Sequence, residues 1–206
     1  MRGASVWGLV ADVHGNLAAL DTALSALRDA GATRLAFLGD YLGRGASDAC
    51  VARIQAVGGR AVVGNRDLDW QDRVAAETKA WVLSLPLTIA DGPLLLAHGD
   101  ARLTPGTSTA EIGRGFVRAW AQLTAAGAVV LAFGHSHHAR TWRKAAAEAP
   151  AEMLAASTTM GPGYRYFVNV GSTGLPFPGK GGPSVALVDF AAGRIAHLPL
   201  AGPERR

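Results

Sequence analysis

A chain of 206 residues with 49% hydrophobic and 17% charged residues can form one domain with a substantial apolar core, and this composition excludes a disordered or collagen-like protein. Cys50 is the only cysteine, which excludes an internal disulfide and a thiolate zinc cluster. The formal net charge of +4 comes from scattered arginines rather than a basic stripe. This pattern disfavours nucleic acid as a partner and suits small phosphorylated anions.

The apolar run Val6–Ala11 is too short for a signal peptide or a membrane span, and no later run reaches the length of a span. We therefore expect a cytoplasmic protein that does not enter a membrane. No linker or repeat divides the chain, so a single domain over residues 1–206 is predicted. The sequence is compatible with a homo-oligomer.

Short apolar runs that each end in Gly, His or Asp predict the buried strands of the first two thirds of the chain. These are Val6–Ala11, Leu35–Leu38, Ala61–Val63, Leu94–Ala97 and Val129–Phe133. Helical spacing of apolar residues predicts the helices Asn16–Ala30, Ser47–Val57 and Asp69–Leu85. Thr107–Ala126 is expected to form one or two more helices, interrupted near Gly113 and Gly115. Ser47 is the expected N-cap of the second helix. This alternation predicts an α/β domain whose sheet begins as a parallel one.

The character of the sequence changes after about residue 139, where short strands are joined by Gly- and Pro-rich turns. The predicted strands are Thr141–Lys144, Tyr166–Val170, Ser184–Phe190 and Arg194–Leu200. They favour a second, mostly antiparallel sheet, and Ala145–Gly163 is expected to be a surface loop. We expect two sheets packed face to face and flanked by helices.

Polar side chains capable of metal binding follow the five predicted strands. They are Asp12 and His14, Asp40, Asn65, His98, and His135 with His137. The carboxyl ends of strands form the binding crevice of open α/β sheets, so these groups are expected to converge. Asp12 and His14 are two residues apart, as are His135 and His137, and on an extended backbone each pair would project to one side.

Bringing these imidazoles and carboxylates together is energetically unfavourable unless a cation binds them. Two divalent metal ions would satisfy it, and mixed nitrogen and oxygen ligands suit transition metals better than Ca or Mg. Manganese is expected first, with iron, zinc, nickel or cobalt as alternatives.

The blocks Asp12-x-His14, Gly39-Asp40, Gly64-Asn65, His98 and Gly134-His135-Ser136-His137 resemble the five-part signature of the calcineurin-like metallophosphoesterases. Asn169–Pro176 is similar to a block of the small bacterial and archaeal phosphodiesterase branch of that superfamily. The resemblance covers about residues 6 to 190. It implies the metallophosphoesterase fold, a four-layer αββα sandwich of two mixed sheets flanked by helices.

The resemblance also implies roles for these side chains. The first metal would be held by Asp12, His14, Asp40 and His137. Asp40 would bridge to the second metal, which Asn65, His98 and His135 complete. The implied activity is hydrolysis of a small phosphate ester or nucleotide, by direct attack of a metal-bridging hydroxide. Asn65 would contact the substrate as well.

Arg66 stands where the resemblance leads one to expect a histidine near the leaving group. Arginine stays protonated, so it cannot be an ordinary proton donor, but it can stabilise charge on phosphoryl oxygens. We expect Arg66 to act as a catalytic residue oriented by Asp67, and the enzyme to prefer phosphodiesters and other esters with good leaving groups.

Gly39–Gly45 is similar to a phosphate-gripping block of serine/threonine phosphatases and dinucleoside tetraphosphatases, with Gly43 in place of its second Asp. Arg44 is accordingly expected to bind substrate. A phosphatase or tetraphosphate hydrolase is therefore one alternative to the phosphodiesterase. A non-catalytic interaction scaffold, as in the retromer subunit of the superfamily, is another, and a nuclease is disfavoured by the lack of an aromatic and basic tract.

Overall fold

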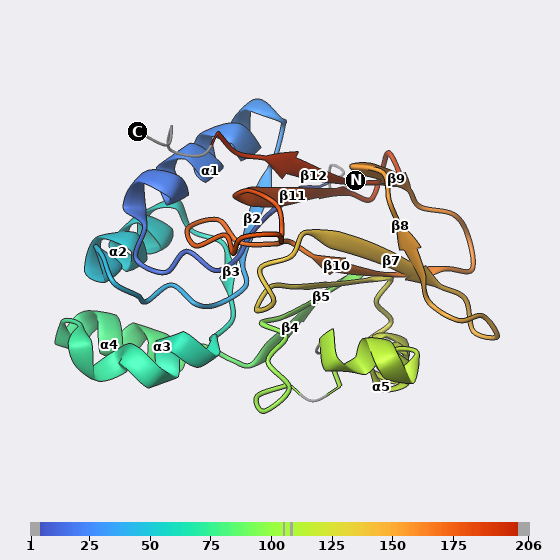
Figure 1. Cartoon of the computed structure of the whole chain (residues 1–206), viewed down its shortest axis with the longest axis horizontal. Coiled ribbons are helices and arrows are strands. Elements are labelled where there is room, and N and C mark those ends of the chain that lie inside the picture. The colour runs from blue at the N-terminus through green and yellow to red at the C-terminus, as the bar shows by residue number, and fades with distance from the viewer. Residues whose placement is uncertain (1–4, 105, 108, 202–206) are drawn as a thin grey trace.

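The computed structural model describes residues 5–104, 106–107 and 109–201, and the side chains of 109–111 are not described. Residues 1–4, 105, 108 and 202–206 of the predicted single domain lie outside this part. Two six-stranded sheets pack face to face, with helices on their outer faces (Figure 1). The prediction of a four-layer αββα sandwich of two mixed sheets is confirmed.

The first sheet joins the beginning of the chain to its end. Its strands, in spatial order, are β3 (Arg60–Ala61), β2 (Arg34–Phe37), β1 (Val6–Val10), β11 (Ser184–Asp189), β12 (Arg194–Pro199) and β9 (Ser157–Thr159). The first three are parallel to one another, and the others pair antiparallel.

The second sheet repeats this plan. Its order is β4 (Thr88–Asp91), β5 (Leu94–Ala97), β6 (Val130–Phe133), β10 (Arg165–Asn169), β7 (Arg140–Lys144) and β8 (Ala151–Met153). The strands β5, β6 and β10 are parallel, and antiparallel strands extend the sheet on both sides. The carboxyl ends of the parallel strands of both sheets carry the candidate site residues.

The later strands do not form a sheet of their own, contrary to the prediction. β11 pairs with β1, and β10 pairs with β6, so each sheet is completed by the C-terminal part of the chain. β1 and β6 are buried, and a buried strand must satisfy its backbone groups on both edges. Residues 145–163, expected to be a loop, contain β8 and β9, and β4 was not predicted at all.

The helices are α1 (Leu17–Asp29), α2 (Ser47–Val57), α3 (Asn65–Trp70), α4 (Ala76–Ser84) and α5 (Val117–Ala125). Short 3₁₀ helices, η1 and η2, cover Gln71–Arg73 and Thr109–Arg114. Two expectations are corrected. The helix predicted over 69–85 begins at Asn65 and breaks near η1, where Val74 is extended. Ser47 is the first residue of α2 rather than its cap, because its hydroxyl is bonded to the backbone of Gly43.

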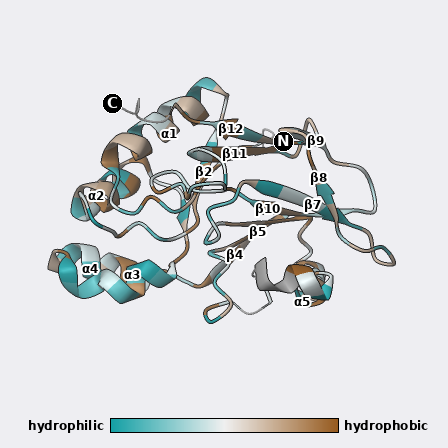
Figure 2. Cartoon of the chain, viewed as in Figure 1, coloured by the Kyte–Doolittle hydropathy of each residue, from teal (hydrophilic) through white to brown (hydrophobic). Residues whose placement is uncertain are grey.

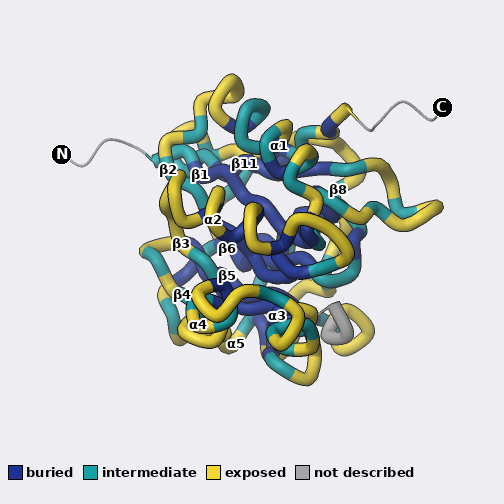
Figure 3. Tube along the Cα trace, turned by 90° about the vertical axis from the view of Figure 1, so that its left-hand side faces the viewer, coloured by how far each residue is buried: buried dark blue, intermediate teal, exposed yellow. Residues whose placement is uncertain are grey.

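Three apolar cores hold the four layers together. Alternate residues of β1 face opposite ways, so Trp7 and Leu9 enter the core between the sheets while Val10 packs under the helical layer. Helices α1, α2 and α4 cover the first sheet, and α5 covers the second. Figure 2 shows hydrophilic and hydrophobic residues alternating along α3 and α4, and Figure 3 shows the buried strands running through the centre.

None of the described helices is both long enough and apolar enough to span a membrane.

Candidate metal centre

The backbone that presents the candidate ligands is left-handed, not extended. In the described part of the chain, six residues other than glycine have a positive φ, and five of them are predicted metal ligands. These are Asp12 (55°), His14 (50°), Asp40 (57°), His135 (65°) and His137 (56°). The expectation that Asp12 and His14 alternate on an extended strand is therefore wrong, since β1 ends at Val10. A positive φ is uncommon outside glycine and concentrates at functional sites.

One cluster of ligand atoms forms around Asp12, His14 and His137, which come from the loops after β1 and β6. Nε2 of His14 lies 3.2 Å from Nε2 of His137, and that atom lies 3.4 Å from Oδ1 of Asp12. Nδ1 of His137 is 2.5 Å from the carbonyl of Leu175 and donates to it, so the lone pair of His137 points into the cluster. Two such nitrogens beside a carboxylate form a candidate metal-binding group.

A second cluster forms around Asn65, His98 and His135. Oδ1 of Asn65 lies 3.0 Å from Nε2 of His98 and 3.0 Å from Nδ1 of His135. Nδ1 of His98 donates to the carbonyl of Leu38 at 2.7 Å, which leaves Nε2 free to bind a metal. The second cluster thus offers one amide oxygen and two imidazole nitrogens.

Asp40 lies between the two clusters. Its Oδ2 is 3.7 Å from Nε2 of His14, and its Oδ1 is 3.4 Å from Nε2 of His98. The two oxygens of one carboxylate therefore face different sets of imidazoles, which is the geometry of a bridging ligand. Asp12 also reaches both sides, because its ligand atom lies within 4.8 Å of those of Asp40 and His98 as well as those of its own cluster.

The negative charges in these clusters favour the binding of additional cations. Oδ1 of Asp12 is buried and has no hydrogen-bond partner among the described residues. Burial lowers the pKa of His98, but the nearby carboxylates of Asp40 and Asp12 outweigh it and raise that pKa to about 10. An unpartnered carboxylate oxygen, and an imidazole whose pKa is raised by nearby carboxylates, favour the binding of a cation here. The residues present fit divalent metal ions.

Two glycines allow the ligand loops to approach closely. A Cβ at Gly64 would lie 2.3 Å from both the backbone nitrogen and Oδ1 of Asp40. A Cβ at Gly134 would lie 2.5 Å from Oδ2 of Asp12. Glycine at these positions therefore lets the Asn65 and His135 loops pack against the two carboxylates.

Asp67 does not contact the guanidinium of Arg66, so the expected orienting contact is corrected. Its carboxylate is fully buried and accepts hydrogen bonds from the backbone nitrogens of Gly64 and of residues 40–42. Burial and the Asp40 carboxylate raise the pKa of Asp67 to about 7, against the lowering effect of these amides. Asp67 lies in the first turn of α3, and its side chain points inward. Its hydrogen bonds hold the loop that carries Asp40.

A cavity of about 660 Å³ adjoins the first cluster at His14, and we call it the arginine cavity. Arg44 and Arg66 line it together with Leu17, Leu42, Trp70 and Leu175. Both arginines are exposed, and neither guanidinium has a hydrogen-bond or ion-pair partner among the described residues. The backbone nitrogen of Arg66 donates to Oδ1 of Asp40 at 2.7 Å, which ties this cavity to the bridging carboxylate.

The last residue of β10 and the loop that follows it support the site, and the sequence predicted no role for them. Nδ2 of Asn169 donates to the carbonyl of Gly134 and to Oγ of Ser136, which fixes the turn between His135 and His137. Oγ of Ser172 donates to the carbonyl of Asp12. The Asn169–Pro176 block was visible in the sequence, but only the fold brings it against these loops.

Phe177 was missed entirely, because nothing in its sequence context marks it. Its ring stacks on the ring of His137 with centroids 4.1 Å apart and an interplanar angle of 5°.

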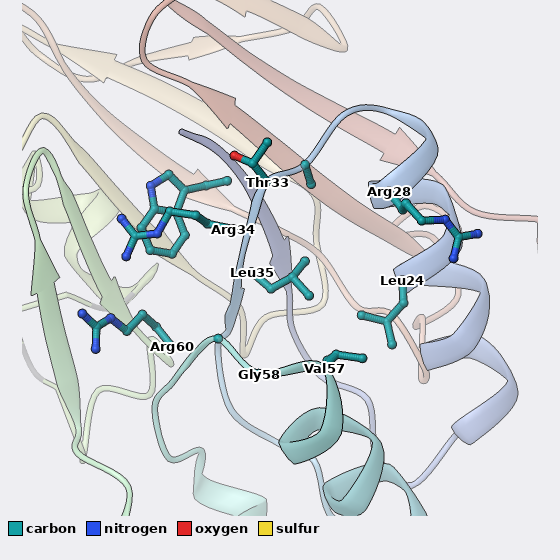
Figure 4. Close-up of a pocket in the computed structure, with 11 residues that line it drawn as sticks. Leu24, Arg28, Thr33, Arg34, Leu35, Val57, Gly58 and Arg60 are labelled. Carbon is teal, nitrogen blue, oxygen red and sulfur yellow. The ribbon is translucent and has the colours of Figure 1, made fainter. Parts of the chain in front are cut away.

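A second cavity, of about 600 Å³, lies between β2 and the C-terminal ends of α1 and α2 (Figure 4). Figure 4 shows Arg34 and Arg60 on one side of it and Arg28 on the other, pointing away. Arg34 and Arg60 both form ion pairs with Asp91, so their charge is compensated. Nothing in this cavity matches the chemistry of the metal centre.

Comparison with known proteins agrees with this geometry. Residues 6–193 match the family described as the calcineurin-like phosphoesterase superfamily domain. No curated protein matches the chain. A metallophosphoesterase from Sphaerobacter thermophilus has a similar structure, with a TM-score of 0.74, 23% identity, and coverage of 96% of this chain and 89% of that one.

Two further solved structures share the fold at lower similarity. An archaeal phosphodiesterase has a TM-score of 0.55 and 13% identity, over 95% of this chain and 99% of its own. Vps29 from Chaetomium thermophilum has a TM-score of 0.52 and 16% identity, over 98% and 100%. The family match over nearly the whole chain establishes that this protein belongs to the calcineurin-like phosphoesterase superfamily.

Proposed function

We propose that this chain is a dinuclear metal-dependent phosphodiesterase that hydrolyses phosphate esters with good leaving groups. The observation that carries the proposal is the position of Asp40, whose two oxygens face His14 on one side and His98 on the other. The buried, unpartnered Oδ1 of Asp12 supports it. The mixed donor set suits manganese first, with iron, zinc, nickel or cobalt as alternatives.

Each side chain has a proposed role. The first cation is assigned to Asp12, His14, Asp40 and His137, and the second to Asp40, Asn65, His98 and His135. Two bound cations would supply an activated water and neutralise charge on the phosphoryl oxygens. The carbonyls of Leu38 and Leu175 hold the imidazoles of His98 and His137 in the tautomer that binds a metal.

Three groups of the chain are proposed to hold the phosphate ester. Oδ1 of Asn65 faces His98 and His135, which leaves its amide nitrogen to donate to a phosphoryl oxygen. Arg66 and Arg44 present unpaired guanidiniums beside His14. Since Arg66 cannot supply a proton, the leaving group departs without protonation from this position, and this favours aryl and phosphate leaving groups.

The test is a matrix of metals and substrates on the purified full chain. The protein is stripped with a chelator and reloaded with each candidate metal, and bound metal is counted by mass spectrometry. Hydrolysis of bis(p-nitrophenyl) phosphate, p-nitrophenyl phosphate and a simple alkyl monoester is then measured. We expect two ions per chain and activity in the order diester, aryl monoester, alkyl monoester.

Asp40→Asn is the decisive variant, with Asp29→Asn as its control because Asp29 is a surface carboxylate with 72% of its side chain exposed. Asp40→Asn should bind fewer than two ions and lose about 100- to 1,000-fold in kcat. Asp29→Asn should match the wild type. A protein that binds no metal, or an Asp40→Asn variant with full activity, contradicts the proposal and favours an interaction scaffold.

A further inference from the structure

His135 differs from two other proposed ligands in the group that its second ring nitrogen faces. The imidazoles of His98 and His137 each have one nitrogen bonded to a backbone carbonyl. His135 faces a carboxylate instead, because its Nε2 lies 3.8 Å from Oδ2 of Asp100. Its Nδ1 lies 3.0 Å from Oδ1 of Asn65, within the second cluster. One nitrogen of this ring therefore faces the proposed cation and the other faces Asp100.

Asp100 follows β5, and its two carboxylate oxygens make different contacts. Oδ1 accepts from the backbone nitrogens of Arg102 at 2.6 Å and of Leu103 at 3.4 Å, which closes a turn. Oδ2 accepts from the guanidinium of Arg102 at 3.1 Å and faces His135. The residue is only 3% exposed. The turn thus holds a buried negative charge in a fixed position beside the imidazole.

Arg102 compensates only part of the charge of Asp100. The side chain of Arg102 is 71% exposed, so water and salt weaken the ion pair between them. The contact between Asp100 and Nε2 of His135 is longer than a hydrogen bond, but both side chains are at least partly shielded from solvent. A carboxylate in this place favours a proton on Nε2, and a proton on Nε2 leaves the lone pair on Nδ1.

The second cluster has less negative charge of its own than the first. The ligands proposed for the first cation include the carboxylates of Asp12 and Asp40. Those proposed for the second share Asp40 and otherwise consist of an amide oxygen and two imidazoles, which are neutral donors. A divalent cation held by such donors is stabilised by a carboxylate on the far side of one of its imidazoles. Asp100 is in that position.

On this basis, and resting on the proposed two-cation centre, we propose that Asp100 is a positioning residue for His135. Its carboxylate holds the imidazole proton on Nε2, so that Nδ1 is presented to the second cation. It also adds negative charge beside the second cluster, which strengthens the binding of the second ion and leaves the first unaffected. The segment His98-Gly99-Asp100 thus provides one proposed ligand and the group that orients another.

Asp100→Asn separates the two roles of the carboxylate. Asparagine keeps an oxygen that can close the turn and places an amide where Oδ2 faces His135. The full chain is stripped with a chelator and titrated with manganese by calorimetry. One ion should bind as in the wild type, and the Kd of the other should rise about 10- to 100-fold. Excess manganese should restore most of the wild-type kcat on bis(p-nitrophenyl) phosphate, which a distorted site would not allow.

Two control variants test whether Asp100 serves only its own turn. Thr104→Val removes the hydroxyl that donates to the Asp100 carbonyl at 3.1 Å, and Arg102→Ala removes the ion pair. Each should change either manganese Kd by less than about threefold, and circular dichroism checks that every variant folds. Equal weakening in all three variants overturns the inference, as does an Asp100→Asn protein that binds both ions normally. Two ions bound by the wild type still support the proposed function in either case.

Failure of the proposed function gives a different result, since the wild type then binds fewer than two ions. The position of the His135 proton in the metal-free chain decides the inference in that case. Burial and His98 lower the pKa of His135, so its ring is neutral at pH 8. Nitrogen NMR, with the signal assigned by its loss in His135→Gln, should find the proton on Nε2 in the wild type and mainly on Nδ1 in Asp100→Asn. The same position in both proteins overturns the inference. Should Asp100→Asn not fold, a wild-type proton on Nδ1 overturns it.

Discussion

The ring of Phe177 lies flat against the imidazole of His137, with centroids 4.1 Å apart. Lys180 also contacts this ring, since its Nζ lies 5.4 Å from the ring centre of Phe177 and donates to the carbonyl of Ser136. Leu175, two residues earlier, accepts from Nδ1 of His137. One short loop thus fixes both the tautomer and the plane of a proposed metal ligand.

Phe177→Ala should therefore weaken metal binding more than it weakens the fold. An aromatic stack contributes about 0.5–1.5 kcal/mol, so we expect the metal Kd to rise about two- to tenfold. Phe177 is 41% exposed, so the melting temperature of the metal-free protein should change little. Calorimetric titration with manganese measures the first effect. Phe177→Tyr, which keeps the ring, should bind like the wild type, and an equal loss in both variants would contradict the stacking role.

Asp67 should prove structural rather than catalytic. Asp67→Ala leaves four backbone N–H groups without their acceptor, which should cost at least about 3 kcal/mol of the free energy of unfolding. Urea denaturation of the metal-free protein measures this. Arg66→Ala is the comparison, because an exposed, unpaired side chain should leave stability unchanged while lowering the rate. A stable Asp67→Ala protein with reduced activity would restore the orienting role.

Arg66→His should change which esters are hydrolysed. Histidine can protonate a leaving oxygen, and general acid catalysis contributes about 100- to 10,000-fold. Rates for a series of aryl and alkyl esters, plotted against leaving-group pKa, should depend less steeply on pKa in Arg66→His than in the wild type. An unchanged slope would count against charge stabilisation as the role of Arg66.

Protonation of His197, in β12, should lower the free energy of unfolding at acidic pH. Burial lowers its pKa to about 4, and its Nε2 lies 2.9 Å from Oγ1 of Thr141. Because the folded pKa is below the ordinary value of 6.5, the unfolded chain binds more protons between pH 6.5 and 4. The contribution is therefore intact above pH 6.5 and is lost at up to about 1.4 kcal/mol per unit as pH falls towards 4. His197→Gln should flatten this part of the stability curve measured by urea denaturation, and an unchanged curve would refute the assignment.

The sequence was sufficient for the fold class because strand period, helix spacing and the polar residues at strand ends all act locally. It could not show which strands of the C-terminal part join which sheet, because β10 and β11 are chosen by the unpaired edges of β6 and β1, far away in the chain. The sequence did not predict β4, β8 and β9, because they are short strands at the sheet edges that form only by pairing with their neighbours.

The candidate site was likewise only partly predictable from the sequence. The seven expected ligands could be listed from their positions after strands, and the fold gathers them. Their backbone conformation could not be predicted, because the positive φ at Asp12 and His135 is uncommon for residues other than glycine. The partners of Asp67 and the stack of Phe177 on His137 both join segments that are distant in sequence.

The left-handed residues have a consequence for how this protein can change. Each non-glycine residue in that conformation costs about 1 kcal/mol or more, so glycine at His14 or His137 would relieve strain while removing a proposed ligand. Variants that lose their ligands could then fold more stably than the parent. Keeping histidine at both positions therefore sacrifices folding stability for the two side chains that form the proposed site.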